Sequence, residues 1–234
     1  MTGVEGAVAL VTGGRRGLGR AYVDALVRHG AVKVYATARK PGSSEDPRIV
    51  TETLDVTDPE SVRSLAERTG DVGIVVNNAG VLIRGPLLTS ATEDVRATFD
   101  TNVFGALHVA QTYAPILARN GGGALVNMLS VFSWASGAGA YGTSKAALWS
   151  MTNSLRLELA GQGTQVLGVH AGFIDTEMVT AIKKPKISPE LVAEKVLQAL
   201  MAGEDEVLVD QLTEQAKAAL AGPVGRLAID RLPG

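Results

Sequence analysis

The stretch VALVTGGRRGLGR at residues 8–20 runs from an apolar segment through a glycine cluster into the start of a helical pattern. Residues 8–12 are predicted to form a buried strand, and residues 18–29 carry the apolar spacing of a helix that Gly30 closes. Glycines at such a junction let the backbone approach a phosphate, which the helix N-terminus attracts. A tight turn without a ligand is the alternative, but the flanking strand and helix favour a dinucleotide site.

The rest of the chain repeats this alternation of short apolar segments and longer helical patterns. Further strands are predicted at residues 33–38, 51–55, 72–77, 124–128, 165–170 and 206–209. Helices are predicted at residues 59–68, 89–119, 141–160 and 189–202. Apolar strands that alternate with helices imply a parallel sheet covered on both faces. Since no linker-like tract interrupts the 234 residues, the sequence predicts a single α/β domain over residues 1–234, a doubly wound, Rossmann-like parallel sheet.

Composition narrows the classes of function. The net charge of −2 gives no reason to expect nucleic acid or an anionic membrane as a partner, and no apolar stretch approaches the ~20 residues of a membrane helix. Without cysteine the chain has no disulfide or thiolate metal site, and its three histidines lack metal-ligand spacing. The first residues lack the pattern of a secretion signal. We therefore expect a cytoplasmic protein that holds no metal.

Several short motifs follow one another along the chain, each at the end of a predicted strand or on a predicted helix. They are Thr12-Gly13-x-x-x-Gly17-x-Gly19, Asp55, Asn77-Asn78-Ala79-Gly80, Asn102, Ser130, Tyr141-x-x-x-Lys145 and Gly172-x-x-x-Thr176. Each motif is weak alone, but in this order they resemble the short-chain dehydrogenase/reductase family, in its compact single-domain branch, over nearly the whole chain. The resemblance implies an oxidoreductase that moves a hydride between a nicotinamide cofactor and a carbonyl or alcohol.

Tyr141 and Lys145 lie four residues apart and therefore on one face of their predicted helix. A tyrosine, with a pKa of about 10, is a poor base at neutral pH, and a nearby ammonium is expected to lower that pKa. On spacing alone, the pair is more typical of an ordinary amphipathic helix. The resemblance implies that Tyr141 is the catalytic acid/base, that Lys145 and Ser130 assist it, and that Asn102 kinks its helix and holds a water that relays protons through Lys145.

The end of the second predicted strand selects the nicotinamide cofactor in a dinucleotide fold. Residues 35–40 contain no carboxylate, while Arg39 and Arg16 offer guanidinium groups for a 2′-phosphate. The sequence therefore favours NADP(H), with solvated loop charges at Arg39 and Lys40 as the alternative. By resemblance, the cofactor-binding residues are Thr12, Gly13, Arg16, Gly17, Leu18, Gly19, Arg39, Asp55, Val56, Asn78, Ala79, Gly80, Tyr141, Lys145, Gly172, Ile174 and Thr176. Asp55 is equally suited to capping a helix or turn.

The substrate end is less informative. Residues 177–188 are predicted to form a short lid, whose lysines at 183, 184 and 186 either meet an anionic or carrier-linked substrate or remain solvated. Trp134, close to Ser130, is a further candidate for lining a substrate pocket. The small-molecule partner is expected to be a carbonyl or alcohol of unknown identity.

The helices predicted at residues 89–119 and 141–160 carry more apolar surface than one core face needs. Together with the resemblance, this surface predicts a homodimer or homotetramer with closed symmetry. A non-enzymatic NADP(H)-binding sensor on the same fold is the alternative function. Such a sensor would not need Tyr141, Lys145, Ser130 and Asn102 together, so their joint presence favours an enzyme.

Overall fold

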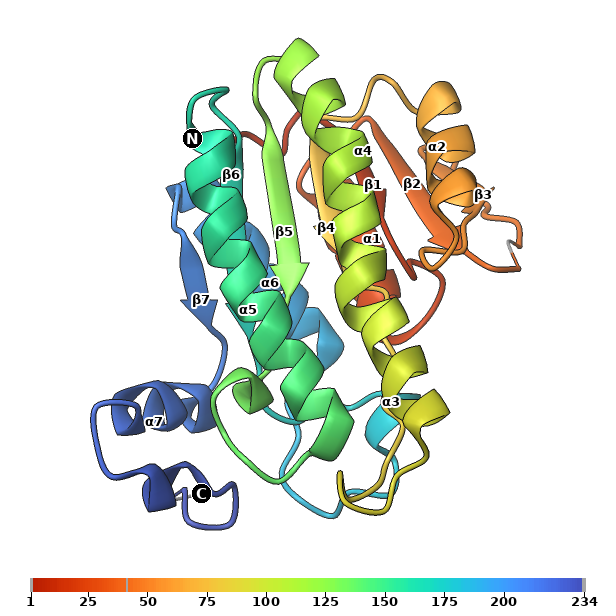
Figure 1. The fold of residues 1–234 in the computed structure, drawn as a ribbon. Coiled ribbons are helices and arrows are strands. Elements are labelled where there is room, and N and C mark those ends of the chain that lie inside the picture. Colours follow the sequence, from red (N-terminus) through yellow and green to blue (C-terminus); the bar gives the residue numbers. More distant parts are fainter. Residues whose placement is uncertain (1, 41, 233–234) are drawn as a thin grey trace.

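All seven strands run parallel in one sheet, in the order β3-β2-β1-β4-β5-β6-β7 (Figure 1). The strands are β1 (Val8–Val11), β2 (Lys33–Ala38), β3 (Ile49–Thr53), β4 (Ile74–Asn77), β5 (Ala124–Met128), β6 (Gln165–His170) and β7 (Glu206–Leu208). This is a computed structural model, and it describes residues 2–40 and 42–232. Because the strand order reverses between β1 and β4, a crevice is expected at their carboxyl ends. The predicted Rossmann-like sheet is confirmed.

Helices cover both faces of the sheet, as Figure 1 shows. On one face α1 (Gly17–Arg28) packs against α6 (Pro189–Ala202). On the other face lie α2 (Pro59–Arg68), α4 (Gly105–Arg119) and α5 (Gly139–Ala160). A further helix, α3 (Thr92–Phe99), precedes α4, and α7 (Gln211–Ala219) follows β7. The functional loops leave the sheet at the carboxyl ends of the strands, which point down in Figure 1.

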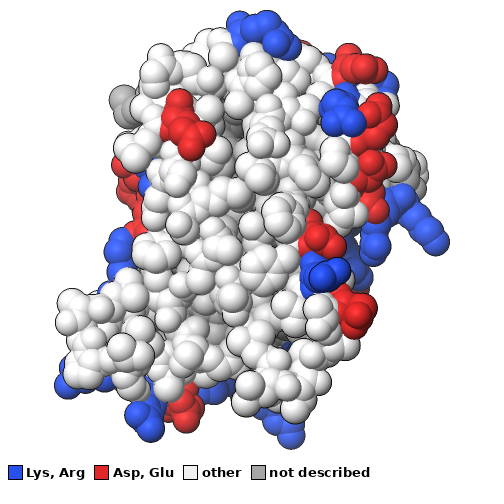
Figure 2. Space-filling view, viewed as in Figure 1, with Lys and Arg blue, Asp and Glu red and all other residues white. Residues whose placement is uncertain are grey.

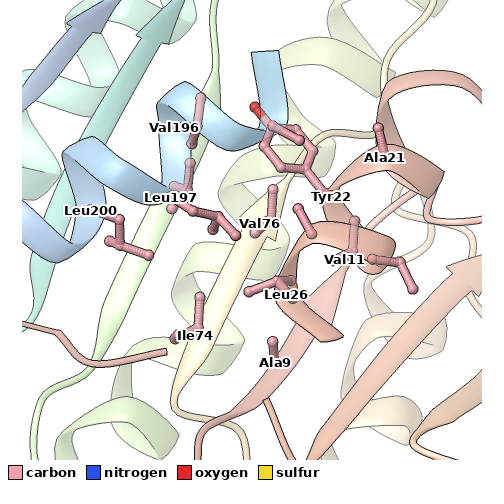
Figure 3. Packing of buried hydrophobic residues seen from close by; sticks show 14 of the residues in the cluster. Ala9, Val11, Ala21, Tyr22, Leu26, Ile74, Val76, Val196, Leu197 and Leu200 are labelled. Carbon is pink, nitrogen blue, oxygen red and sulfur yellow. The ribbon is translucent and has the colours of Figure 1, made fainter. Parts of the chain in front are cut away.

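The core consists of a hydrophobic layer on each side of the sheet. Figure 3 shows the layer in which Tyr22 and Leu26 of α1 face Leu197 and Leu200 of α6 across the strand residue Ile74. All five side chains are at most 1% exposed. A side chain of this size contributes ~1.5–3 kcal/mol when fully buried. This packing fixes α1, and with it the glycine-rich turn that precedes it.

Several element boundaries differ from the predictions by one or two residues, and three differences are informative. The third strand ends at Thr53 rather than at Asp55, because the Asp55 carboxylate accepts hydrogen bonds from Thr57 N and Oγ1 and closes a turn. The helix predicted from residue 89 begins at Thr92 and contains a π-helical segment, Asp100–Phe104. Helix α7 was not predicted. Gly30, at φ +91°, ends α1 as predicted.

Across residues 2–40 and 42–232, no helix combines the length and the apolar character that crossing a membrane requires.

Candidate active site

The glycine-rich turn between β1 and α1 forms an open cradle of backbone groups. Gly13 and Gly17 have positive φ values of +65° and +52°. A Cβ on Gly19 would lie 2.1 Å from the Gly13 carbonyl oxygen, so only glycine fits there. In the described part of the chain no side chain caps the first turn of α1, which leaves its N–H groups free. The helix start is uncapped, and the glycines of the preceding turn leave the backbone accessible. This arrangement fits the pyrophosphate of a dinucleotide.

Thr12 and Asn78 join the ends of β1 and β4 beside this cradle. The Thr12 hydroxyl oxygen accepts hydrogen bonds from Asn78 N at 3.0 Å and Ala79 N at 2.9 Å. The Asn78 side-chain amide donates to the Thr12 carbonyl at 2.9 Å. Gly80 comes next in the chain and lies close to Asn102, because a Cβ on Gly80 would be 3.2 Å from Asn102 Oδ1. The predicted residues Thr12, Asn78, Ala79 and Gly80 therefore meet at the point where the strand order reverses.

The structure separates the two arginines of the glycine-rich turn. Arg16, predicted beside Arg39, instead pairs its guanidinium with Glu177 at the start of the lid. Its neighbour Arg15 donates to the Lys40 carbonyl at 3.1 Å, at the end of β2 where Arg39 follows. The structure therefore brings Arg15 rather than Arg16 to the Arg39 side of the crevice. The side chains of adjacent residues in an extended segment point in opposite directions. The motif alone does not reveal which of the two arginines faces Arg39.

Asp55 and Val56 follow β3 next to the same corner of the sheet. Hydrogen bonds from Thr57 lower the pKa of Asp55, and the Arg39 guanidinium adds to that effect. Val56 is 8% exposed and packs against Gly105 of α4, where a Cβ would come within 2.7 Å of it. Asp55 thus makes the predicted turn contact, and contact with adenine remains a prediction for both residues.

Asn102 lies in the π-helical segment between α3 and α4 and is 1% exposed. Its Oδ1 accepts from Val81 N at 2.8 Å, while its Nδ2 donates to the Val81 carbonyl and to Ser144 Oγ, both at 3.0 Å. Ser144 in turn donates to the Tyr141 carbonyl at 2.7 Å. The predicted irregularity at Asn102 is therefore a π-bulge, and Ser144 links it to the first turns of α5. Ser144 did not stand out in the sequence, because a serine inside a helix carries no signal of its own.

Ser130, directly beyond β5, is held on three sides. Its backbone N–H donates to Ser133 Oγ at 3.3 Å, and its Oγ accepts from Phe132 N at 3.2 Å. Its carbonyl oxygen lies 3.1 Å from His170 Nδ1 at the end of β6. The contact with Phe132 uses one lone pair of the hydroxyl oxygen and not its hydrogen, so this hydroxyl can still act as a donor.

His170 is the clearest residue supporting the candidate site that the sequence did not indicate. It is fully buried, and burial lowers its pKa to about 3, so the ring is neutral and Nδ1 donates to the Ser130 carbonyl. The Trp134 ring stacks on it at 3.8 Å. The Glu206 carboxylate, 3.4 Å from Nε2, is paired with Lys217. Trp134 is 7% exposed, so its predicted role in lining a substrate pocket is wrong: the indole is a support beneath the loop of Ser130.

Tyr141 and Lys145 lie on one face of α5, as predicted, with the Lys145 ammonium 5.7 Å from the centre of the Tyr141 ring. Lys145 donates to the Met128 carbonyl at 2.6 Å. Burial raises the pKa of Tyr141, and the nearby Ser130 hydroxyl only partly opposes this rise. The expected lowering of the Tyr141 pKa by Lys145 is therefore wrong for this structure. The reason is that Lys145 is bound by a carbonyl and faces the ring rather than the phenol oxygen.

The segment after β6 closes over the glycine-rich turn. A Cβ on Gly17 would lie 3.3 Å from Thr176 Cγ2, so the two segments almost touch. Gly172 N donates to Asp210 at 2.6 Å, and Ile174 pairs with Ile187 to close the base of the lid. The short helix Glu177–Val179 starts the lid. Gly172, Ile174 and Thr176 thus flank the crevice from the side opposite to Arg39.

The buried ammonium of Lys145 should reduce the stability of the fold. Burial lowers its pKa from 10.5 to about 8, so the penalty is complete below pH 8 and disappears as pH rises towards 10.5. We predict that Lys145→Met increases the free energy of unfolding at pH 7 by about 2 kcal/mol, after allowing for the lost bond to Met128. Urea unfolding at pH 7 and pH 10 measures this, and the gain should shrink at pH 10.

Lys195→Met is the matched control, because Lys195 also donates to a backbone carbonyl, that of Val209 at 2.7 Å, but is only half-buried. It should give no gain at either pH. An equal gain in both variants would mean that the buried charge of Lys145 is not what limits stability.

Comparison with known proteins gives consistent matches. Residues 7–187 match the family description short chain dehydrogenase. An uncharacterized oxidoreductase of Staphylococcus aureus strain USA300 is 32% identical over 217 residues, which cover 86% of this chain and 93% of the relative. A sorbitol dehydrogenase of Cereibacter sphaeroides is 35% identical over 186 residues, covering 74% of this chain and 73% of that enzyme.

Among solved structures, a short chain dehydrogenase from Burkholderia cenocepacia J2315, in complex with NADP, superimposes with a TM-score of 0.91. It is 38% identical, and the match covers 100% of both chains. The glycine cradle, the motif order and these matches agree, and the chain belongs to the short-chain dehydrogenase family of oxidoreductases.

Proposed function

We propose that this oxidoreductase uses NADP(H) to reduce a carbonyl compound to an alcohol, and to catalyse the reverse reaction, with Tyr141 as the acid/base. The observation that carries the proposal is the convergence of Ser130, Tyr141 and Lys145 at the carboxyl end of β5, beside the glycine cradle. NADP(H), when bound, supplies or accepts the hydride.

Each residue has a separate task in this proposal. The Ser130 hydroxyl donates to the substrate oxygen and orients it, while its own oxygen accepts from Phe132 N. Since burial raises the pKa of Tyr141, the phenol is protonated at neutral pH and gives its proton to the oxygen as negative charge develops there. Lys145, with its pKa lowered to about 8, can exchange a proton near neutral pH and restore the phenol. Asn102 and Ser144 fix the backbone beneath Tyr141.

Two cationic side chains support the choice of NADP(H). Arg15 and Arg39 lie at the end of β2, where this chain has no carboxylate to bind a ribose hydroxyl. Guanidinium groups suit the doubly charged 2′-phosphate. The Burkholderia cenocepacia relative was crystallised with NADP. Arg16, with its side chain on Glu177, is assigned to the lid side rather than to the 2′-phosphate.

Tyr141→Phe tests the chemistry because it removes only the hydroxyl. Turnover should fall by ~10²–10⁴-fold, the range for a lost general acid/base, while NADPH affinity stays unchanged. Fluorescence titration measures binding, and nicotinamide absorbance follows the reduction of a panel of aldehydes and ketones. Tyr113→Phe is the control, since that buried hydroxyl bonds with Thr69 and with none of the residues proposed for the site. Retention of more than about a tenth of wild-type turnover in Tyr141→Phe would show that this hydroxyl is not the proton donor, whereas NADPH binding without any turnover in the wild type would favour the non-enzymatic NADP(H)-binding sensor.

Arg39→Asp tests the cofactor choice. The new carboxylate should repel the 2′-phosphate and weaken NADPH binding by ~2 kcal/mol or more, while NADH binding improves or stays the same. Arg15→Ala should weaken NADPH selectively in the same direction, and Arg16→Ala should affect NADPH and NADH equally. A wild-type protein that binds NADH more tightly than NADPH would contradict the assignment.

We also propose a homo-oligomer formed through α4 and α5. Figure 2 shows that the face over these helices carries few charged side chains between its margins. Leu157 on α5 is 82% exposed, an unusual position for a leucine in a free monomer. Light scattering at micromolar concentration should give the mass of a dimer or tetramer, and Leu157→Lys should shift it towards the monomer. A monomeric mass for the wild type would overturn this proposal.

A further inference from the structure

The peptide unit that joins Ser130 to Val131 is bound at both ends by consecutive residues at the end of β6. Its N–H donates to the Ala171 carbonyl at 2.8 Å. Its carbonyl oxygen accepts from Ser133 N at 3.0 Å, within the same turn, and from His170 Nδ1 at 3.1 Å. A bond at each end fixes the orientation of the peptide plane. It therefore also fixes the direction in which the Ser130 side chain leaves the backbone.

A side chain is used here because the sheet ends on the other side of this segment. β4 pairs with β5 only as far as Asn127, which comes before Ser130 in the chain. Ser130 is itself extended, at φ −165° and ψ 162°, and only 4% exposed. Buried carbonyl groups need hydrogen-bond donors. The imidazole of His170 supplies one from β6, where β4 no longer offers a backbone partner.

The surroundings of the imidazole fix both its plane and its hydrogen. The Trp134 ring stacks on it at 3.8 Å and meets Trp149 edge-on at 5.9 Å. The Glu206 carboxylate lies 3.4 Å from Nε2, but its charge is compensated by the ammonium of Lys217. A carbonyl oxygen can only accept, so the bond to Ser130 requires the hydrogen of the neutral ring on Nδ1. The compensated carboxylate does not draw this hydrogen to Nε2.

We propose that His170 is a positioning residue for the reaction: its Nδ1–H group holds the peptide unit after Ser130 and thereby directs the Ser130 hydroxyl at the substrate oxygen beside Tyr141. This inference rests on the proposed carbonyl reduction and adds a residue that touches neither substrate nor cofactor. It makes a specific demand on the side chain at position 170. A hydrogen-bond donor at the place of Nδ1 is required, and a buried ring of the same size is not sufficient.

Two variants separate the donor from the ring. His170→Phe keeps a ring that can stack on Trp134 but has no donor, whereas His170→Asn puts an amide nitrogen at the place of Nδ1. We expect kcat for aldehyde reduction to fall about tenfold in His170→Phe, the scale of one lost hydrogen bond, and to stay near the wild-type value in His170→Asn. NADPH affinity should be unchanged in both. Equal losses of kcat in the two variants would overturn the proposal. His170→Gln, whose amide lies one bond farther out, should match His170→Phe and replaces it if that variant does not fold.

A double-mutant cycle tests whether His170 acts through Ser130. Ser130→Ala keeps the backbone carbonyl that His170 binds but removes the hydroxyl that it is proposed to direct. Adding His170→Phe to Ser130→Ala should therefore cause no further loss of kcat. A merely structural role would lower kcat by the same factor with and without the hydroxyl, and that result would contradict the proposal. If Ser130→Ala has no measurable turnover, the comparison of His170→Asn with His170→Phe decides.

A measurement without substrate keeps this proposal separate from the proposed function. Nitrogen NMR distinguishes a ring nitrogen that carries hydrogen from a bare one, and the signals of His170 are those that disappear in His170→Asn. We expect hydrogen on Nδ1 and none on Nε2; hydrogen on Nε2 alone would overturn the proposal. If the wild type reduces no carbonyl compound but Nδ1 carries the hydrogen, the carbonyl reduction fails and the hold of His170 on Ser130 stands. If reduction proceeds equally well in His170→Phe, the positioning role fails and the carbonyl reduction stands.

Discussion

The hydrogen bonds between Thr12 and the segment after β4 hold together the point on which the whole site depends. In a parallel sheet the crevice exists only where the strand order reverses, here between β1 and β4. Thr12 accepts from two successive N–H groups, at Asn78 and Ala79, and the Asn78 amide returns a bond to the β1 end. These contacts fix the glycine cradle relative to Gly80. Gly80 in turn lies against Asn102, so the cofactor side and the catalytic side share one rigid junction.

The catalytic side shows a conflict between stability and chemistry. Lys145, 5% exposed, places an ammonium in a setting that lowers its pKa to about 8. A core built for stability alone would hold an apolar side chain there. The structure bonds the amine to a single strand carbonyl, that of Met128, and packs the Tyr141 ring beside it. This arrangement keeps the amine close to the phenol, and the cost in folding free energy that we predict for it is typical of functional sites.

Most of the fold could be predicted from the sequence because its signals are local. Apolar runs, glycine turns and helix periodicity gave the order of the elements, the place of Ser130 just beyond a strand and the shared helix face of Tyr141 and Lys145. The roles expected for these residues came from the family resemblance. What the sequence did not reveal depends on contacts between distant segments. His170 supports Ser130 from another strand, 40 residues away, and α7 packs beneath the same loop. The positions of the Arg15 and Arg16 side chains depend on the direction of a turn, and the higher pKa of Tyr141 depends on burial that spacing does not show.

The same division between local and distant contacts explains why the reaction is easier to infer than its substrate. The groups proposed to handle the proton lie at the end of β5 and on α5, within one run of sequence. Phe173, the segment predicted to form a lid and the C-terminal residues Ile229 and Leu232 lie far apart in the sequence and meet only in the folded protein. The bridge between Ser136 and Ala228 ties the C-terminal segment to the loop that carries Ser130. Because this bridge joins distant parts of the chain, the sequence around Ser130 does not reveal it.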